Sequence, residues 1–176
     1  MTVRTLQPIR ERLGRAQTAF FRAADAIPCE KWGNCPGFDE WSAAELVAHL
    51  VVVERGVVTN VDRLTQKALI PVPFPKRIHL PLWLVEARVI RRKSPVPLDD
   101  SLLAEKEAML AGLRGVRERT LAFIAETEGR DLSAYCWRHP FIGMLNVYEW
   151  MEMIAAHQLR HTKQVREIEA KLSRKL

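Results

Sequence analysis

The chain has 176 residues, 48% of them hydrophobic and 27% charged, with 27 Lys and Arg against 21 Asp and Glu and a formal net charge of +6. This composition excludes disordered, collagen-like and disulfide-rich classes of protein. A chain of this length buries roughly 70% of its unfolded surface, so folding requires neither disulfides nor a structural metal. We therefore expect a single domain over residues 1–176.

The apolar runs are short, and stretches such as Val51 to Val53 fall far below the ~18 residues that a membrane-spanning helix needs. Charged residues between Arg4 and Arg15 interrupt every candidate signal-peptide core, so no membrane association or secretion is expected. The sequence has three cysteines and no CxxC pair, which favours a reducing compartment. We expect a cytoplasmic protein.

The densest basic run comprises Arg88, Arg91, Arg92 and Lys93. It lacks the interleaved aromatic residues of a groove that binds single-stranded nucleic acid. The run favours a solvated helix face, with an anionic partner as a weaker alternative. Nucleic acid is therefore not an expected partner.

The first half of the chain carries two helical patterns. Apolar residues spaced by three and four from Leu6 to Ile27 predict an amphipathic helix that ends at Pro28. A loop to Trp41 follows, and the capping box Ser42 to Glu45 predicts the start of a second helix, which continues to the prolines that begin at Pro71.

The segment Ile70–Asp100 is rich in proline and is expected to be a long crossover with one short helix between Pro81 and Lys93. The acidic pair and serine at 99–101 predict the start of a third long helix, which Gly129 would terminate. A fourth apolar stripe runs over 147–172, and no alternating strand pattern is found. These patterns predict an all-α fold, an antiparallel four-helix bundle with a long Pro-rich crossover between helices 2 and 3.

Three histidines lie on the inward stripes of these helices. His157 and His161 are spaced i, i+4, which places both imidazoles on one helix face, and His49 lies on the core side of the second helix. A buried imidazole without a partner is costly, whereas one divalent metal satisfies three ring nitrogens at once. Any one of them could instead be a hydrogen-bonded core residue. We predict that His49, His157 and His161 form a metal site, provided that His49 lies near the other two.

The remaining polar candidates have simpler interpretations. His79 and His139 lie in loops and are expected to be structural, and the capping box accounts for Glu45. Arg160 is expected at an interface or on the surface. No carboxylate shares the stripe of the histidine pair, so the general base is not identified.

Two regions resemble one known family. The segment Trp41–Leu50, the His139-Pro140 pair followed by Gly143, and the H-x-x-R-H-x-x-Q helix beginning at His157 are similar to motifs of the DinB-like superfamily, also called YfiT-like metal-dependent hydrolases. The resemblance implies a four-helix bundle in which His49, His157 and His161 hold a divalent ion, commonly zinc, nickel or iron. It also favours a homodimer. The related members include transferases and isomerases that use low-molecular-weight thiols.

Three protein ligands leave at least one coordination position open to water, a thiolate or a substrate oxygen. We therefore expect a metal-dependent hydrolase or thiol-dependent transferase acting on a small molecule, with a low-molecular-weight thiol as one candidate. The alternative is a non-catalytic stress-response module that binds a metal or a small molecule.

Overall fold

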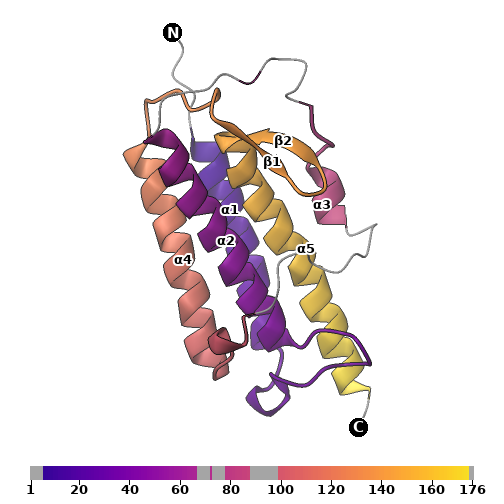
Figure 1. Ribbon diagram of the computed structural model, residues 1–176. Coiled ribbons are helices and arrows are strands. Elements are labelled where there is room, and N and C mark those ends of the chain that lie inside the picture. The colour runs from indigo at the N-terminus through magenta and orange to yellow at the C-terminus, as the bar shows by residue number, and fades with distance from the viewer. Residues whose placement is uncertain (1–5, 67–71, 73–77, 88–98, 175–176) are drawn as a thin grey trace.

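The computed structural model describes residues 6–66, 72, 78–87 and 99–174, and four long helices dominate it (Figure 1). The long helices are α1 (Gln7–Asp25), α2 (Ala43–Thr65), α4 (Lys106–Glu126) and α5 (Val147–Ser173). The shorter elements are η1 (Cys29–Lys31), α3 (Trp83–Ala87), η3 (Asp100–Leu102), β1 (Cys136–His139) and β2 (Gly143–Asn146).

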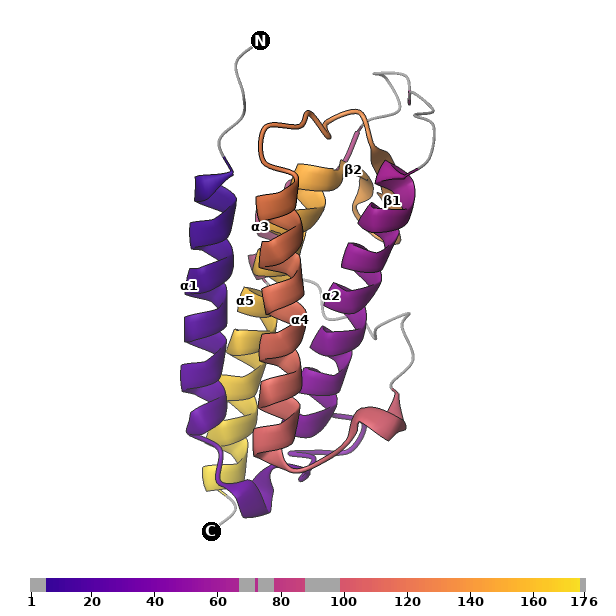
Figure 2. The same ribbon diagram turned by 90° about the vertical axis from the view of Figure 1, so that its left-hand side faces the viewer.

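Two helices run in each direction along the bundle. Figure 2 shows α1 and α5 running one way and α2 and α4 the other, which confirms the predicted antiparallel four-helix bundle. The most extensive packing joins α1 to α5 and α2 to α4, and each of these pairs runs in the same direction. The long crossover is needed because α4 starts at the same end of the bundle as α2. Its short helix α3, which was also expected, packs against α5.

Helix starts follow the local chemistry of the chain. The predicted capping box is present at α2, where Ser42 Oγ accepts from the Glu45 amide and the Glu45 carboxylate accepts from the Ser42 amide. Asn146 and Glu149 form a second capping box at α5. The third long helix begins at Lys106 rather than directly after Ser101. The reason is that Asp99 accepts from the backbone and the hydroxyl of Ser101 and closes a separate 3-10 turn there.

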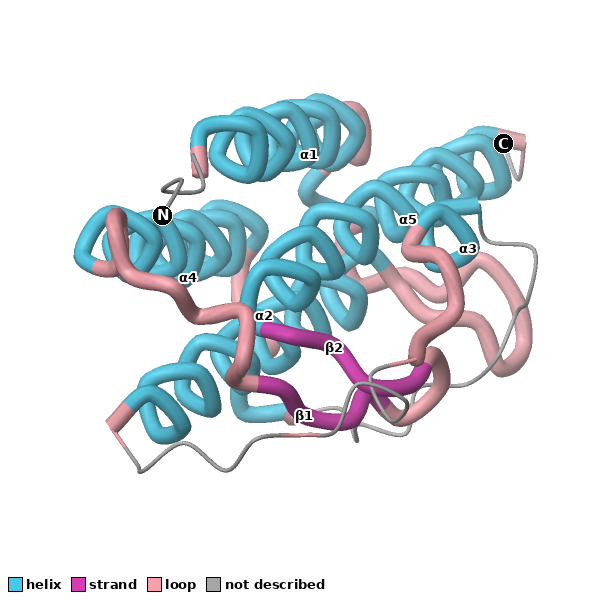
Figure 3. Tube along the Cα trace, turned by 90° about the horizontal axis from the view of Figure 1, so that it is seen from above, coloured by secondary structure: helices cyan, strands magenta, loops and turns pink. Residues whose placement is uncertain are grey.

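A small hairpin, which the sequence analysis did not predict, lies at one end of the bundle beside α5 (Figure 3). Strands β1 and β2 have four residues each, too short for an alternating pattern to stand out. The chain around His79 pairs with the other edge of β2, with the Met144 amide donating to Ile78 O at 3.1 Å. Gly143 has φ +108°, and a Cβ there would lie 2.4 Å from Ile78 O, so only glycine allows this approach.

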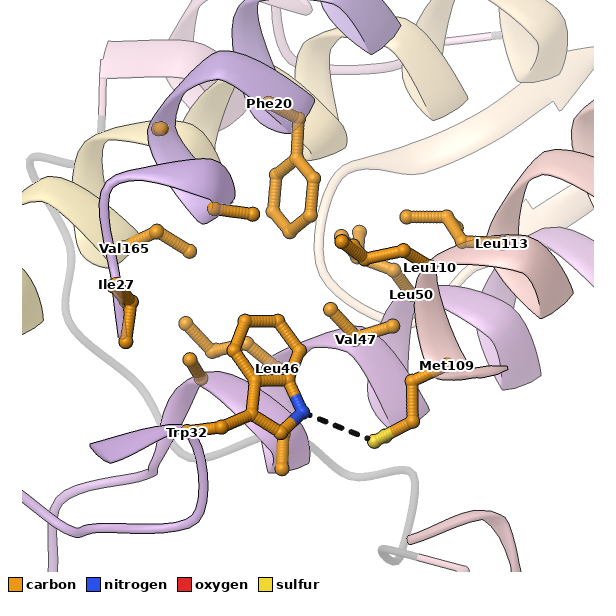
Figure 4. Packing of buried hydrophobic residues seen from close by; sticks show 14 of the residues in the cluster. Phe20, Ile27, Trp32, Leu46, Val47, Leu50, Met109, Leu110, Leu113 and Val165 are labelled. Carbon is orange, nitrogen blue, oxygen red and sulfur yellow. Dashed lines mark hydrogen bonds between the residues drawn. The ribbon is translucent and has the colours of Figure 1, made fainter. Parts of the chain in front are cut away.

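The core fills the space between the helices from one end of the bundle to the other. Near η1, Trp32 inserts among residues of α1, α2 and α4, and its Nε1 donates to Met109 Sδ at 3.4 Å (Figure 4). Lys106, a polar residue on the apolar stripe, is buried because its Nζ donates to Ile27 O at 2.7 Å and Asp25 O at 3.3 Å. It thereby satisfies carbonyl groups at the end of α1.

Three other expectations concern the cysteines, the basic run and membrane-spanning segments. All three cysteines are free thiols, and Cys29 and Cys35 are exposed. The basic run Arg88, Arg91, Arg92 and Lys93 lies outside the described residues. Among the described helices, none combines the length and apolar character needed to cross a membrane.

Candidate metal centre

The three histidines singled out in the sequence converge on one point. Nε2 of His157 lies 3.2 Å from Nε2 of His49 and 3.1 Å from Nε2 of His161. One candidate ligand atom from each residue lies within 4.8 Å of the other two. Helices α2 and α5 run in opposite directions, and the first half of α2 lies beside the middle of α5, which brings together His49 and His157 although they are 108 residues apart in the sequence.

The nitrogen spacing suits a first-row divalent ion. Two zinc–nitrogen bonds of about 2.05 Å that meet at a tetrahedral angle hold their nitrogens about 3.3 Å apart. The separations of Nε2 of His157 from Nε2 of His49 and of His161, 3.2 and 3.1 Å, are close to this value. The donor set therefore fits such an ion, and the three histidines could hold one.

The positions of the protons on the three rings also favour a bound cation. His161 Nδ1 lies 3.1 Å from Gln164 Oε1, and it must donate because an amide oxygen only accepts. In the neutral ring, Nε2 of His161 then carries a lone pair and no proton. One proton on His157 Nε2 can point to only one of its two neighbours, so one close N···N contact is left without a hydrogen bond. A cation that takes all three lone pairs removes this conflict.

Burial keeps two of these rings neutral. Desolvation lowers the pKa of His49 from 6.5 to about 4. The pKa of His157 is lowered well below 6.5, and desolvation is the largest cause. The smaller causes, in order of size, are the charges of His161, His49, Arg160 and His139. At neutral pH the lone pairs of both rings are therefore available without loss of a proton.

One aromatic side chain packs against the cluster. The ring of Trp41 lies 5.1 Å from that of His49, centroid to centroid. Within the described part of the chain, the three histidines form the one group of three or more potential ligands, and neither Cys nor a carboxylate joins them. Glu45 is occupied by the capping box, as predicted. The arrangement thus offers three nitrogen donors and no fourth protein ligand among the described residues.

A buried polar network, which the sequence analysis missed, connects all four long helices next to the histidines. Arg117 on α4 forms a two-point ion pair with Glu54 on α2, at 2.7 and 3.0 Å. Its guanidinium also donates to Leu13 O on α1 and to Gln158 Oε1 on α5. Gln158 directly follows His157 in the sequence, so the network fixes α5 at the position where it presents its histidines. Thr120 completes it by donating to Glu54 at 2.7 Å.

Sequence signals for this network existed. Glu54 and Gln158 fall on or beside apolar stripes, and Arg117 adjoins Val116 on the third stripe. A polar residue at such a position indicates a buried partner, but the sequence does not tell which helix supplies it.

The other residues considered in the sequence lie outside the histidine cluster. His79 Nδ1 lies 2.8 Å from Leu80 O, and its Nε2 lies 3.2 Å from a carboxylate oxygen of Glu149. His139 ends β1, and its Nδ1 accepts from backbone amides of the hairpin turn. Arg160 is half-buried and donates to Val85 O at 3.3 Å, as expected for a residue at an interface between helices.

Comparison with known proteins assigns this architecture to a family. The profile of the DinB superfamily matches residues 12–165. The chain belongs to the DinB superfamily. It is 27% identical over 146 residues to the uncharacterized protein YuaE of Bacillus subtilis (strain 168), covering 82% of this chain and 87% of YuaE.

A solved structure shares the fold. The crystal structure of TT2238, a four-helix bundle protein, superposes with a TM-score of 0.60 at 18% identity. The match covers 93% of this chain and 99% of TT2238. This DinB protein thus shares its four-helix fold with an experimentally determined bundle.

Proposed function

We propose that this DinB protein is a divalent-metal-dependent enzyme, a hydrolase or a thiol-dependent transferase, with His49, His157 and His161 as the three metal ligands. The observation that carries the proposal is the convergence of three Nε2 atoms from α2 and α5 on one point. The absence of a fourth ligand among the described residues supports an exchangeable coordination position rather than a closed structural site.

Each residue of the centre has a definable task. A bound zinc, nickel or iron ion would lower the pKa of water or of a thiol and so supply a nucleophile at neutral pH. His49 and His157 present neutral nitrogens because burial lowers the pKa of each ring. Gln164 holds the His161 ring so that its Nε2 faces the cluster. Trp41 packs against His49 and restricts its rotation.

The substrate belongs in this proposal to the class of small molecules, with a low-molecular-weight thiol as the leading candidate. The exposed free thiols of Cys29 and Cys35 support a reducing compartment such as the cytoplasm. Membership of the DinB superfamily over residues 12–165 supports one domain. We also propose a homodimer, as the resemblance to the family implies.

Metal occupancy tests the ligand assignment directly. We expect His157→Ala and His161→Ala to lose most of the bound metal, measured by elemental analysis of the purified proteins. His79→Ala is the matched control, because its ring contacts Leu80 and Glu149 rather than the cluster. Equal metal content in all three variants would end the proposal.

The reaction class requires a second experiment. We expect the metal-loaded protein to hydrolyse esters or amides, or to transfer a low-molecular-weight thiol, and to lose this activity in a chelator. Activity that returns when the metal is restored supports catalysis. A loaded protein inactive in both screens would favour the non-catalytic binding module.

A further inference from the structure

His139 lies beside the same face of α5 as the metal centre. Its ring centroid is 5.2 Å from that of Trp150 and 6.1 Å from that of Phe141. Trp150 precedes His157 by seven residues, which places both on one face of α5, about 10 Å apart along the helix axis. The hairpin therefore holds an imidazole over the stretch of α5 that leads to His157.

Backbone hydrogen bonds fix where His139 carries its proton. Its Nδ1 accepts from the Phe141 amide at 3.1 Å and the Ile142 amide at 3.4 Å, so Nδ1 cannot be protonated. Burial lowers the pKa of His139 from 6.5 to about 4, and the ring is neutral at pH 7. The single proton then lies on Nε2. Residues 6–66, 72, 78–87 and 99–174 supply no acceptor for this N–H, although hydrogen bonds fix the rest of the ring.

The surroundings favour an anionic ligand with a flat body. Arg160 follows His157 by three residues on α5, so it lies on the next turn of the helix, about 4.5 Å farther along the axis. Arg160 therefore brings a permanent positive charge into this neighbourhood, while one of its nitrogens is held by Val85 O. The ring of Phe141, which is 47% exposed, offers flat apolar surface beside the imidazole, whereas Trp150 is buried and stacks on Trp137.

We propose that His139 is a substrate-binding residue, whose Nε2–H donates to the carboxylate of a small planar substrate positioned at the His49, His157 and His161 centre. This inference rests on the proposed function and adds a substrate class to it. A fixed neutral donor is suited to the task because binding a carboxylate then requires no proton uptake and no reorientation of the ring.

Two substitutions separate this role from a structural one. In His139→Asn, Oδ1 takes the place of Nδ1 and can accept from the two turn amides, but no N–H reaches the Nε2 position. In His139→Gln, an amide N–H lies at the Nε2 position while the acceptor for the turn is lost. His79→Asn is the control for a histidine that packs on the same hairpin but not on Trp150.

The experiment uses benzoate as the probe and the zinc-loaded full chain. We expect His139→Asn to keep its zinc content and melting temperature but to weaken benzoate binding at least about tenfold by calorimetry, as expected for a lost hydrogen bond to a charged group. His139→Gln should recover part of the affinity, and His79→Asn should bind as the unaltered protein does. In the unaltered protein, ¹H–¹⁵N spectra should show a protonated Nε2 that shifts on addition of benzoate.

Three outcomes overturn the inference. Benzoate binding that is unchanged in zinc-loaded His139→Asn would exclude the hydrogen bond, and an unaltered zinc-loaded protein that does not bind benzoate would exclude the substrate class. Loss of zinc or of melting temperature in His139→Asn would assign the residue a structural role. In each of these cases the zinc content of the unaltered protein stands, whereas a protein that takes up no zinc at all overturns the proposed function instead.

Discussion

The buried ring of His49 makes the metal-free protein sensitive to acid. Its pKa is about 4 in the folded protein and 6.5 in the unfolded chain, so between these values the unfolded chain binds more protons. The free energy of unfolding should therefore fall as the pH is lowered from 6.5 to 4. The contribution of His49 is at most about 3.5 kcal/mol, since one pKa unit corresponds to about 1.4 kcal/mol. Urea unfolding at pH 7 and pH 4.5 with chelator present measures this loss.

His49→Gln provides the comparison for this pH dependence. Gln does not titrate, so the variant should lose less stability between pH 7 and pH 4.5 than the unaltered protein. Identical slopes for the two proteins would contradict the assigned shift in the pKa of His49.

Lys106 should contribute to stability despite its charge. Its Nζ donates to Ile27 O and Asp25 O, and Lys106→Met leaves both carbonyls without this donor. We expect a loss of about 1–3 kcal/mol in the free energy of unfolding, the usual cost of an unsatisfied buried polar group. Lys163→Met is the control, because Lys163 donates to Glu86 O at an exposed position and should cost far less. Equal losses in urea titrations of both variants would argue against this role.

The hairpin depends on a glycine for a steric reason. In Gly143→Ala the new Cβ meets Ile78 O at 2.4 Å and His79 Cα at 2.9 Å, in addition to the strain of φ +108°. Gly129→Ala has a comparable backbone strain at φ +85° but no atom within 4 Å of the new Cβ. We expect about 1 kcal/mol of destabilisation at Gly129, the usual cost of a positive φ, and clearly more at Gly143. Thermal unfolding of the two variants under one condition compares them, and equal melting temperatures would argue against a tight contact.

The helices could be predicted from the sequence because periodicity and caps are local signals. The stripe from Leu6 to Ile27 and the capping box at Ser42 each depend on residues within a few positions of one another. The hairpin could not be found this way. Its strands are short, and β2 gains its second neighbour from the chain around His79, more than 60 residues earlier. Such pairing depends on the complete fold.

The polar network around Arg117 links all four long helices of the bundle. In Arg117→Met the carboxylate of Glu54 stays buried without its charged partner, and we expect about 3–5 kcal/mol of destabilisation. Adding Glu54→Gln removes the stranded charge, so the double variant should recover part of this loss. Chemical denaturation of the single and double variants tests the coupling. Strictly additive losses would show that the two residues act independently.

Part of the histidine cluster could be predicted from the sequence. The i, i+4 spacing of His157 and His161 places them together on any helix, but the meeting with His49 depends on how α2 packs against α5. That arrangement is a property of the whole bundle. Their role as metal ligands stays a prediction until metal content is measured. The tautomer of His139 could not be predicted from the sequence, because it depends on the hydrogen bonds that its Nδ1 accepts in the hairpin turn.

The contact between His49 and His157 joins points of the chain that are 108 residues apart. An ion held by both rings would be released when the chain unfolds, so it would stabilise the folded protein by an amount that grows with the concentration of the free ion. The stability of the folded protein would then depend on how much of the dissolved ion is present, and so would its lifetime against proteolysis.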